Sequence, residues 1–336
     1  MSIATAVFSP DVLTIDAVAV SATIESQIRE IVLQRLNRKG VIVAMSGGID
    51  SSVVAALCFN ALGTTRVLGL MLPEADSSPD SLRFANLLAQ SLGLRTHIED
   101  IAPILTAAGC YQRRDEAIRK VIPAYLEGYK CKIVLPDQIN GSAYPIFSVI
   151  VESPLGERTK ARLTPDSYLG VVAATNFKQR TRKMMEYYYA DLFNYAVAGT
   201  PNRLEFDQGF FVKNGDGAAD LKPIAHLYKT QVYQLAAHLG IPQEIQKRPP
   251  TTDTYPLDQS QEEFYFPLPY DRMDLCLYAK NHGLRPEEVA PVIELTTEQV
   301  ARVYRVIDAT RNATRYLHRK PVLCEEVPEV PDDVRL

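Results

Sequence analysis

Hydrophobic residues follow two patterns in the first hundred positions of the chain. Short apolar runs predict buried parallel strands at 41–45 and 67–72, and 95–101 is expected to form the next strand. Apolar residues three and four positions apart predict helices, which cover 17–36, 53–63 and 78–93. Ser78 and Pro79 suit the start of the last helix, and Gly93 can end it. Strands and helices that alternate in this way predict βαβ units and a parallel sheet.

The alternation resumes in the second half of the chain. Residues 180–194 and 228–240 read as helices, with a strand at 195–199 between them. From about Asp271 the pattern is again helical. The pattern therefore predicts an α/β fold with a doubly wound parallel sheet and C-terminal helices.

A segment between these two halves interrupts the pattern. Two strand-like stretches flank Ser153-Pro154-Leu155-Gly156, which predicts a β-hairpin or flap. We expect one domain over 1–336, with this insertion at 130–170 and a helical part at 271–320.

Composition and charge exclude several classes of protein. The chain has 336 residues and a formal net charge of −4, from 36 basic and 40 acidic residues, which argues against a protein that coats nucleic acid. Five cysteines without a CxxC pair disfavour disulfides and a zinc site. No signal peptide and no apolar run of about 18 residues is present. We therefore expect a cytoplasmic protein without membrane or nucleic-acid partners.

One segment carries the strongest chemical signal, at the turn from the first strand into a helix. It comprises Ser46, Gly47, Gly48, Ile49, Asp50, Ser51 and Ser52. Two glycines let the backbone approach a ligand, the hydroxyls are donors, and the helix N-terminus favours an anion. A carboxylate beside bound phosphate requires a cation, so we interpret Asp50 as a Mg²⁺ ligand. The alternative interpretation is a capped helix start without a ligand.

This loop, SGGIDSS, resembles that of the ATP pyrophosphatases, which cleave ATP into AMP and pyrophosphate. The second half of the chain narrows this resemblance to one family among the ATP pyrophosphatases. Three segments resemble motifs of NAD synthetases in order and spacing. GTPNRLE (199–205) resembles GT-x-N-(K/R)-x-E, and the segment from Gly209 to Asp220 resembles G-(Y/F)-F-x-K-x-GDG-x-AD. The segment from Pro223 to Lys229 resembles P-(I/L)-x-x-L-x-K. NFKQRTRKM (176–184) is similar to their N-x-KAR-x-RM helix. The chain thus resembles the ammonia-dependent NAD synthetases.

The resemblance implies a reaction and a role for individual residues. The enzyme would convert deamido-NAD, ATP and ammonia into NAD, AMP and pyrophosphate through an acyl-adenylate. Asp50 and Glu205 would bind Mg²⁺ and act in catalysis with Lys229. The loop 46–52 would bind the ATP phosphates, and the other implied ATP contacts are Thr200, Lys229 and Thr251. The implied contacts to deamido-NAD are Arg180, Lys213, Asp220, His318 and Arg319.

The chemistry of the reaction requires these types of residue. A carboxylate must attack the α-phosphorus of ATP although both reactants are anionic. A metal ion and a lysine reduce the repulsion and stabilise charge on the departing pyrophosphate. Ammonia then displaces AMP from the acyl-adenylate, and no enzyme nucleophile is required.

Several alternatives stay open at this stage. The insertion, the stretch after Thr251, and Pro201 and Leu204 depart from the family pattern, which favours the same chemistry on another carboxylate. A tRNA-thiolating enzyme and an ATP-binding regulatory protein have less support. Arg180 could instead pair with Glu186 or Asp191 on its own helix, and His318 could be structural.

The source of ammonia and the oligomeric state are expectations from the same resemblance. About forty residues precede the ATP loop, and the first cysteine is Cys58, so the glutaminase domain of glutamine-dependent relatives is not expected here. Ammonia would be free or come from a separate subunit. A homodimer is expected, as in the family.

Overall fold

The computed structural model describes residues 8–135, 147–251, 254–259, 265–325 and 327–330. Four of its strands form a parallel sheet in the order β3-β2-β1-β7, and these are β1 (Val41–Ala44), β2 (Val67–Met71), β3 (Thr96–Ile98) and β7 (Ala196–Ala198). Val41 pairs in register with Val67 on one side and with Ala196 on the other. The predicted strands are therefore confirmed.

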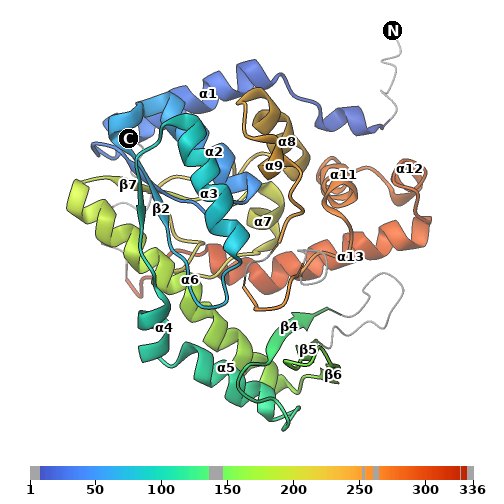
Figure 1. The fold of residues 1–336 in the computed structure, drawn as a ribbon. Helices are drawn as coiled ribbons and strands as arrows, with labels where there is room; N and C mark the ends of the chain where they lie inside the picture. Colours follow the sequence, from blue (N-terminus) through green and yellow to red (C-terminus); the bar gives the residue numbers. More distant parts are fainter. Residues whose placement is uncertain (1–7, 136–146, 252–253, 260–264, 326, 331–336) are drawn as a thin grey trace.

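Helices cover both faces of this sheet (Figure 1). One face carries α1 (Ala17–Glu30), α2 (Ile49–Leu62), α3 (Pro79–Leu92) and α8 (Lys229–His238). The other face carries α4 (Ala102–Ala107), α5 (Cys110–Arg119) and α6 (Pro165–Phe193). Alternate residues of β1 point to the two opposite faces of the sheet. Val41 and Val43 pack under α2, whereas Ile42 packs under α6. The doubly wound fold is thus confirmed.

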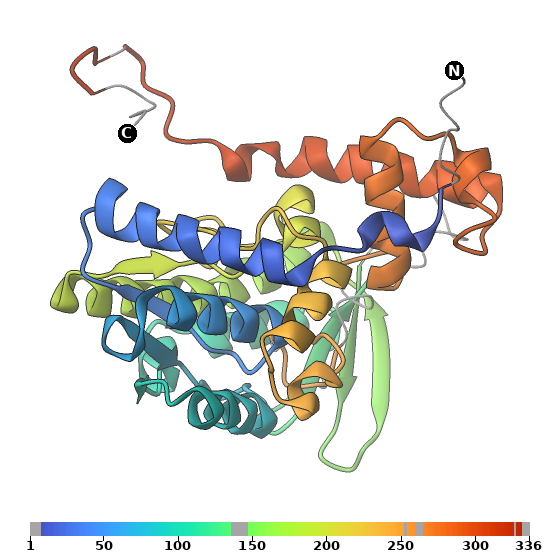
Figure 2. The same cartoon turned by 90° about the horizontal axis from the view of Figure 1, so that it is seen from above.

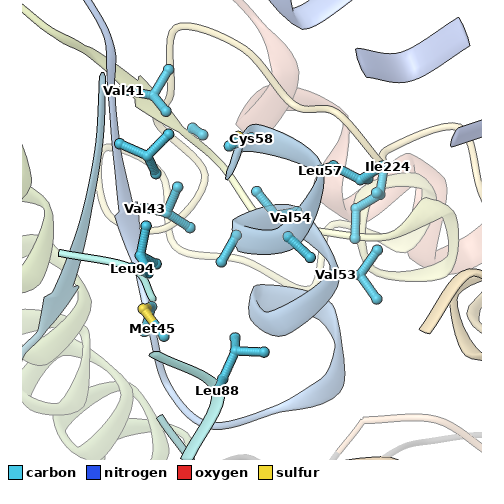
Figure 3. Packing of buried hydrophobic residues seen from close by; sticks show 14 of the residues in the cluster. Val41, Val43, Met45, Val53, Val54, Leu57, Cys58, Leu88, Leu94 and Ile224 are labelled. Carbon is cyan, nitrogen blue, oxygen red and sulfur yellow. The ribbon is translucent and has the colours of Figure 1, made fainter. Parts of the chain in front are cut away.

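Helix α2 lies at the centre of the larger core (Figure 3). Val53, Val54, Leu57 and Cys58 of this helix are completely buried between the sheet and the helices α1, α3 and α8. Burial of each large side chain of this kind stabilises the fold by about 1.5–3 kcal/mol. Because α2 is held so firmly, the loop at its N-terminus has a rigid support.

The insertion forms a second, antiparallel sheet of three strands: β4 (Lys130–Val134), β5 (Ser148–Glu152) and β6 (Arg158–Arg162). Figure 2 shows β5 and β6 in green beside the parallel sheet. The predicted hairpin is confirmed, and β4 extends it.

Helix α6 begins much earlier than the sequence pattern suggested, at Pro165 instead of about 180, and so overlaps the predicted insertion. The reason is local: Thr164 Oγ1 accepts a hydrogen bond from Ser167 N at 3.2 Å and caps the helix, and Pro165 suits its first turn.

The described part of the chain also contains helical turns at Pro10–Leu13, Ile31–Arg35 and Thr64–Arg66, short helices and a C-terminal group. The short helices are α7 (Arg203–Gln208) and α9 (Gln243–Gln246). The C-terminal group comprises α11 (Tyr270–Asn281), α12 (Pro286–Val289), α13 (Thr297–Thr314) and a 3-10 turn (Arg315–His318). Leu204 of α7 and Tyr228 before α8 belong to the core of this group. No helix in the described residues is both long and apolar enough to cross a membrane.

The strand order creates one position where the chain changes direction. From β1 the chain proceeds outward to β2 and β3, and it later returns to β7 on the other side of β1. In open α/β sheets, ligands bind at the carboxyl ends of the strands beside this switch point. The loops that follow β1 and β7 therefore mark the expected site.

Candidate active site

A cavity of about 440 Å³ opens beside the switch point. Its walls come from the loops after β1, β2 and β7, from the middle of α6, and from two later segments, 209–212 and 248–251. Segments that are far apart in sequence thus meet around one space.

The loop after β1 forms one end of this cavity. Ser46, Gly48, Ile49, Asp50 and Ser51 line it, so the N-terminus of α2 and its partial positive charge face the cavity. This placement matches the predicted phosphate-binding loop.

Two residues of the loop support it without lining the cavity. Gly47 has φ +73°, and a Cβ at this position would lie 2.4 Å from the carbonyl oxygen of Ser81, so no larger residue fits. The hydroxyl of Ser52 donates to the carbonyl oxygen of Gly48 at 2.8 Å, and that of Ser51 donates to the same oxygen at 3.0 Å. The serines therefore fix the loop as well as offering donors.

Lys229, Asp50 and Glu205 meet at the same end of the cavity. The ammonium of Lys229, at the start of α8, forms an ion pair with the Oδ2 of Asp50. The Oδ1 of Asp50 accepts a hydrogen bond from Asn202 Nδ2 at 3.0 Å. Asn202 also caps α7: its Oδ1 accepts from Glu205 N at 3.1 Å, while Glu205 Oε2 accepts from Asn202 N at 3.2 Å. Asn202 thus joins the two acidic residues.

The charges of this group reinforce one another. Burial alone would lower the pKa of Lys229, but the carboxylates of Asp50 and Glu205 outweigh it and raise that pKa above its usual value. The lysine therefore stays an ammonium ion at neutral pH. A charged lysine beside the phosphate loop is suited to an anionic ligand.

The two carboxylates also fit a Mg²⁺ ion that is shared with a ligand. Mg²⁺ is usually held by one or two protein carboxylates together with water and substrate phosphates. Asp50 and Glu205 both line the cavity. The described residues contain no cluster of three or more His, Cys, Asp or Glu side chains placed to hold a metal. The donor set thus suits an ion brought in with nucleotide phosphates.

Three further residues complete this end of the cavity. Thr200 and Thr251, both predicted to contact ATP, line it. Sequence reasoning missed Arg248, which donates to the carbonyl oxygen of Gly47 at 3.4 Å and to Ser81 Oγ at 3.1 Å. Arg248 lines the cavity and adds a positive charge beside the loop 46–52. Its only sequence signal was a basic pair before Pro249-Pro250.

The five residues expected to contact deamido-NAD do not line the cavity. Arg180 Nε donates to the carbonyl oxygen of Lys213 at 3.3 Å, and among the described residues it forms no ion pair with Glu186, which pairs with Lys183, or with Asp191. Lys213 Nζ in turn donates to the carbonyl oxygen of Arg319 at 3.2 Å. These three residues therefore form a group of their own next to the cavity.

The other two have structural contacts. The Oδ2 of Asp220 accepts a hydrogen bond from Val197 N at 2.7 Å, beside the parallel sheet. The ring of His318 packs edge-on against Phe206 and Phe211, at 4.9 and 5.1 Å between ring centroids. Burial lowers the pKa of His318, as does the charge of Lys222.

A second ion pair, missed by sequence reasoning, lines the cavity from α6. Lys183 Nζ lies 2.6 Å from Glu186 Oε2, and the two side chains are only 6% and 4% exposed. Asp216, which also lines the cavity, accepts a hydrogen bond from Val212 N at 2.7 Å. Burial raises the pKa values of Glu186 and Asp216.

A buried network of charges supports the wall between the loop after β2 and α6. Lys178 of α6 lies 3.0 Å from Glu74 Oε1 and 2.5 Å from Asp76 Oδ2, and it donates to the carbonyl oxygen of Thr254 at 2.8 Å. Arg114 of α5 also pairs with Asp76. The network ties together loops whose neighbouring residues line the cavity.

Known proteins are similar to this chain in sequence and in fold. The family model described as NAD synthase matches residues 20–124 and 151–316, and the unmatched stretch between them contains β4. An NH(3)-dependent NAD(+) synthetase of Rhizobium meliloti (strain 1021) is 56% identical over 324 residues, which are 96% of this chain and 97% of the relative.

Solved structures are similar in fold. The NMN synthetase from Francisella tularensis has a TM-score of 0.64 at 20% identity, over 92% of this chain and 99% of that one. The NH3-dependent NAD synthetase from Campylobacter jejuni has a TM-score of 0.61 at 23% identity, over 93% of this chain and 100% of that one.

Proposed function

Because the chain belongs to the NAD synthase family, we propose that it is an ammonia-dependent NAD synthetase, which makes NAD, AMP and pyrophosphate from deamido-NAD, ATP and ammonia. The observation that carries this proposal is the meeting of Lys229, Asp50 and Glu205 beside the loop after β1. This group combines a charged lysine, two carboxylates and a helix N-terminus around one cavity.

The phosphate loop and the lysine have separate tasks in this reaction. The amides and hydroxyls of residues 46–51 bind the triphosphate and align its α-phosphorus with the incoming carboxylate. Lys229 stabilises the negative charge that develops on the phosphates as pyrophosphate departs. Asn202 holds Asp50 in place by its hydrogen bond. Ammonia then attacks the acyl-adenylate carbonyl, and AMP leaves.

Asp50 and Glu205 would hold Mg²⁺ between the protein and the ATP phosphates. When bound, the ion would neutralise phosphate charge and polarise the bond to the leaving group. Without a cation, the two carboxylates would repel the triphosphate, although the ammonium of Lys229 offsets part of their charge.

A second candidate is the same adenylation and amidation on a different carboxylate. It is favoured by the position of Arg180, Lys213, Asp220, His318 and Arg319, none of which lines the cavity.

In a homodimer, these five residues could contact substrate near the interface between the two copies. Helix α6 exposes Met184, Tyr188 and Leu192, which are 52%, 55% and 59% exposed and lie at intervals of one turn. Arg180 is one turn before Met184 on the same helix. We propose that this apolar stripe contacts a second copy and that part of the substrate binds near the contact.

A product assay tests the proposal. The full chain is incubated with Mg-ATP, deamido-NAD and ammonium, and NAD, AMP and pyrophosphate are separated by chromatography. Equal amounts of the three products are expected. If deamido-NAD gives none of them while another carboxylate releases AMP and pyrophosphate, the second candidate is correct. If no carboxylate releases AMP, both candidates fail.

A further inference from the structure

We propose that Asp274 is a positioning residue for the reaction: from α11, it fixes the first turn of α8 and thereby the direction of Lys229. Asp274 lies in the C-terminal helices, 224 positions after Asp50, and it does not line the cavity. The inference rests on the proposed role of Lys229.

The contact between the two helices is specific. Lys229 is the first residue of α8, and Thr230 is the second. The Oδ2 of Asp274 accepts two hydrogen bonds from Thr230, one from its backbone N at 2.7 Å and one from its Oγ1 at 2.8 Å. The first amide groups of a helix have no partner within the helix. Asp274 therefore accepts a hydrogen bond from a first-turn amide of α8, as a capping side chain does, but it does so from another helix.

Asp274 occupies this position at a cost in stability. Its side chain is completely buried, and its Oδ1 has no hydrogen-bond partner among the described residues. Burial raises its pKa to about 6. An apolar residue at such a site would usually be tolerated or even preferred for stability. The favourable terms at this site are the two bonds from Thr230, the positive end of α8 and the charge of Lys229, and all of them lie at the start of α8.

The consequence for the active site follows from the helix geometry. Lys229 is only 2% exposed, and its ammonium pairs with Asp50 across the cavity end. A change in the first turn of α8 moves the lysine backbone directly. A displacement of about 1 Å can lower a reaction rate by about 100-fold. The C-terminal helices thus contribute to catalysis without contacting the substrate.

The test compares two substitutions at Asp274 with the same two at Asp271. Asp271 lies on the same helix but is exposed. Asp274→Asn keeps an acceptor oxygen for Thr230, whereas Asp274→Leu removes it at similar volume. We expect kcat to fall by about 10- to 100-fold in Asp274→Leu, with the KM for ATP within about threefold of wild type, and Asp274→Asn to restore most of the activity. Both Asp271 variants should match wild type.

A double-mutant cycle with Lys229 separates positioning from a general loss of structure. If Asp274 acts through the lysine ammonium, Asp274→Leu should change kcat by less than about twofold in a Lys229→Met background. An equal loss in both backgrounds would overturn the proposal, as would wild-type kcat in Asp274→Leu. Near-normal kcat in Lys229→Met alone would instead refute the role of Lys229, and with it this inference. Synthesis of NAD itself is tested by the product assay.

A milder variant keeps the test decisive if Asp274→Leu does not fold. Thr230→Val removes the hydroxyl donor but leaves the backbone bond to Asp274. We expect a smaller fall in kcat in the same direction, which should again disappear in the Lys229→Met background. Unfolding in urea gives the folded fraction of each variant, so that kcat refers to folded protein. An equal kcat for Thr230→Val and wild type would contradict the proposal.

Discussion

The ion pairs Lys229–Asp50 and Lys183–Glu186 line the same cavity but are built in different ways. The first pair joins α2 and α8 through two residues that are 179 positions apart in the sequence. The side chain of Asp50 in this pair is 15% exposed. The second lies within α6, three positions apart, and both of its side chains are at most 6% exposed. The first pair therefore forms only when two distant helices pack together, whereas the second forms within one turn of a single helix.

Folding acts differently on the lysine of the first pair and on the carboxyl group of the second. The pKa of Lys229 is raised, so folding favours its charged form at neutral pH. The pKa of Glu186 is also raised, because burial outweighs its attraction to Lys183, so folding disfavours its charged form. A lysine between two carboxylates at a cavity end is stabilised, whereas a carboxylate with one lysine in the interior is not. Because the first pair lies beside the loop 46–52, we expect its loss to affect catalysis, whereas the loss of Lys183 would leave a buried carboxyl group without its cation and affect stability.

The largest expected effect is on turnover when the first pair is broken. Asp50→Asn retains the shape of the side chain and an oxygen for Asn202, but it removes the charge. Lys229→Met removes the ammonium. We expect each variant to lose at least about 1000-fold in kcat, since both charges act on the phosphates. The measurement is AMP release under saturating Mg-ATP.

The control for this prediction is folding. Each variant should give the circular dichroism spectrum of the wild type. If Asp50→Asn retains wild-type turnover, Asp50 is not part of the metal site.

The next effect is on stability when the second pair is broken. Lys183→Met leaves Glu186 buried without its cation, and we expect the free energy of unfolding to fall by about 3–5 kcal/mol. Lys183→Met combined with Glu186→Leu should restore most of this loss. The measurement is urea unfolding of the full chain.

A matched exposed pair provides the control. Lys120 pairs with Asp166, and these side chains are 53% and 78% exposed. Lys120→Met should change the free energy of unfolding by less than about 1 kcal/mol. A loss in Lys183→Met no larger than that in Lys120→Met would show that the second pair is not structural.

Local sequence signals explain which parts of the molecule could be predicted. The strands β1 and β2 are continuous apolar runs, and the loop 46–52 is a contiguous motif, so neither depends on the rest of the fold. The start of α6 also has a local signal, because Thr164-Pro165-Asp166 is a helix-start signature, although it lies within the predicted insertion.

Other residues carried no such signal. Lys183 and Glu186 have the spacing of an exposed helical ion pair, and only the packing of α6 against the cavity makes them buried. The one hint was that the position of Lys183 carries methionine in the N-x-KAR-x-RM motif. Asp274 reads as a surface carboxylate, because its partner, the first turn of α8, is 44 positions away. Contacts between distant helices cannot be read from spacing alone.

A smaller effect concerns the pH dependence of the second pair. Without Lys183, the pKa of Glu186 should rise further, since the lysine lowers it in the wild type. A carboxyl group with a raised pKa in the folded state takes up a proton as the pH falls through that value, which removes the cost of its buried charge. The difference in unfolding free energy between the wild type and Lys183→Met should therefore shrink as the pH falls through the pKa of Glu186 in the variant. The change is at most about 1.4 kcal/mol per pH unit. Urea unfolding at several pH values measures it. A loss that stays constant with pH would mean that Glu186 has the same protonation state in both proteins, which contradicts a further rise of its pKa without Lys183.

The smallest expected effect separates two helix caps, one on the helix that carries the second pair and one in contact with the first pair. Thr164 caps α6 and Asn202 caps α7, and replacing either by alanine should cost about 1 kcal/mol of unfolding free energy. Only Asn202 also donates to Asp50, at 3.0 Å. Asn202→Ala should therefore lower kcat by about tenfold, as expected for a lost hydrogen bond to a charged group, whereas Thr164→Ala should leave kcat unchanged. Unfolding curves and steady-state kinetics of the two variants measure both quantities. Equal kcat values would mean that the position of Asp50 depends on Lys229 alone, and that the cap of α7 acts only on stability.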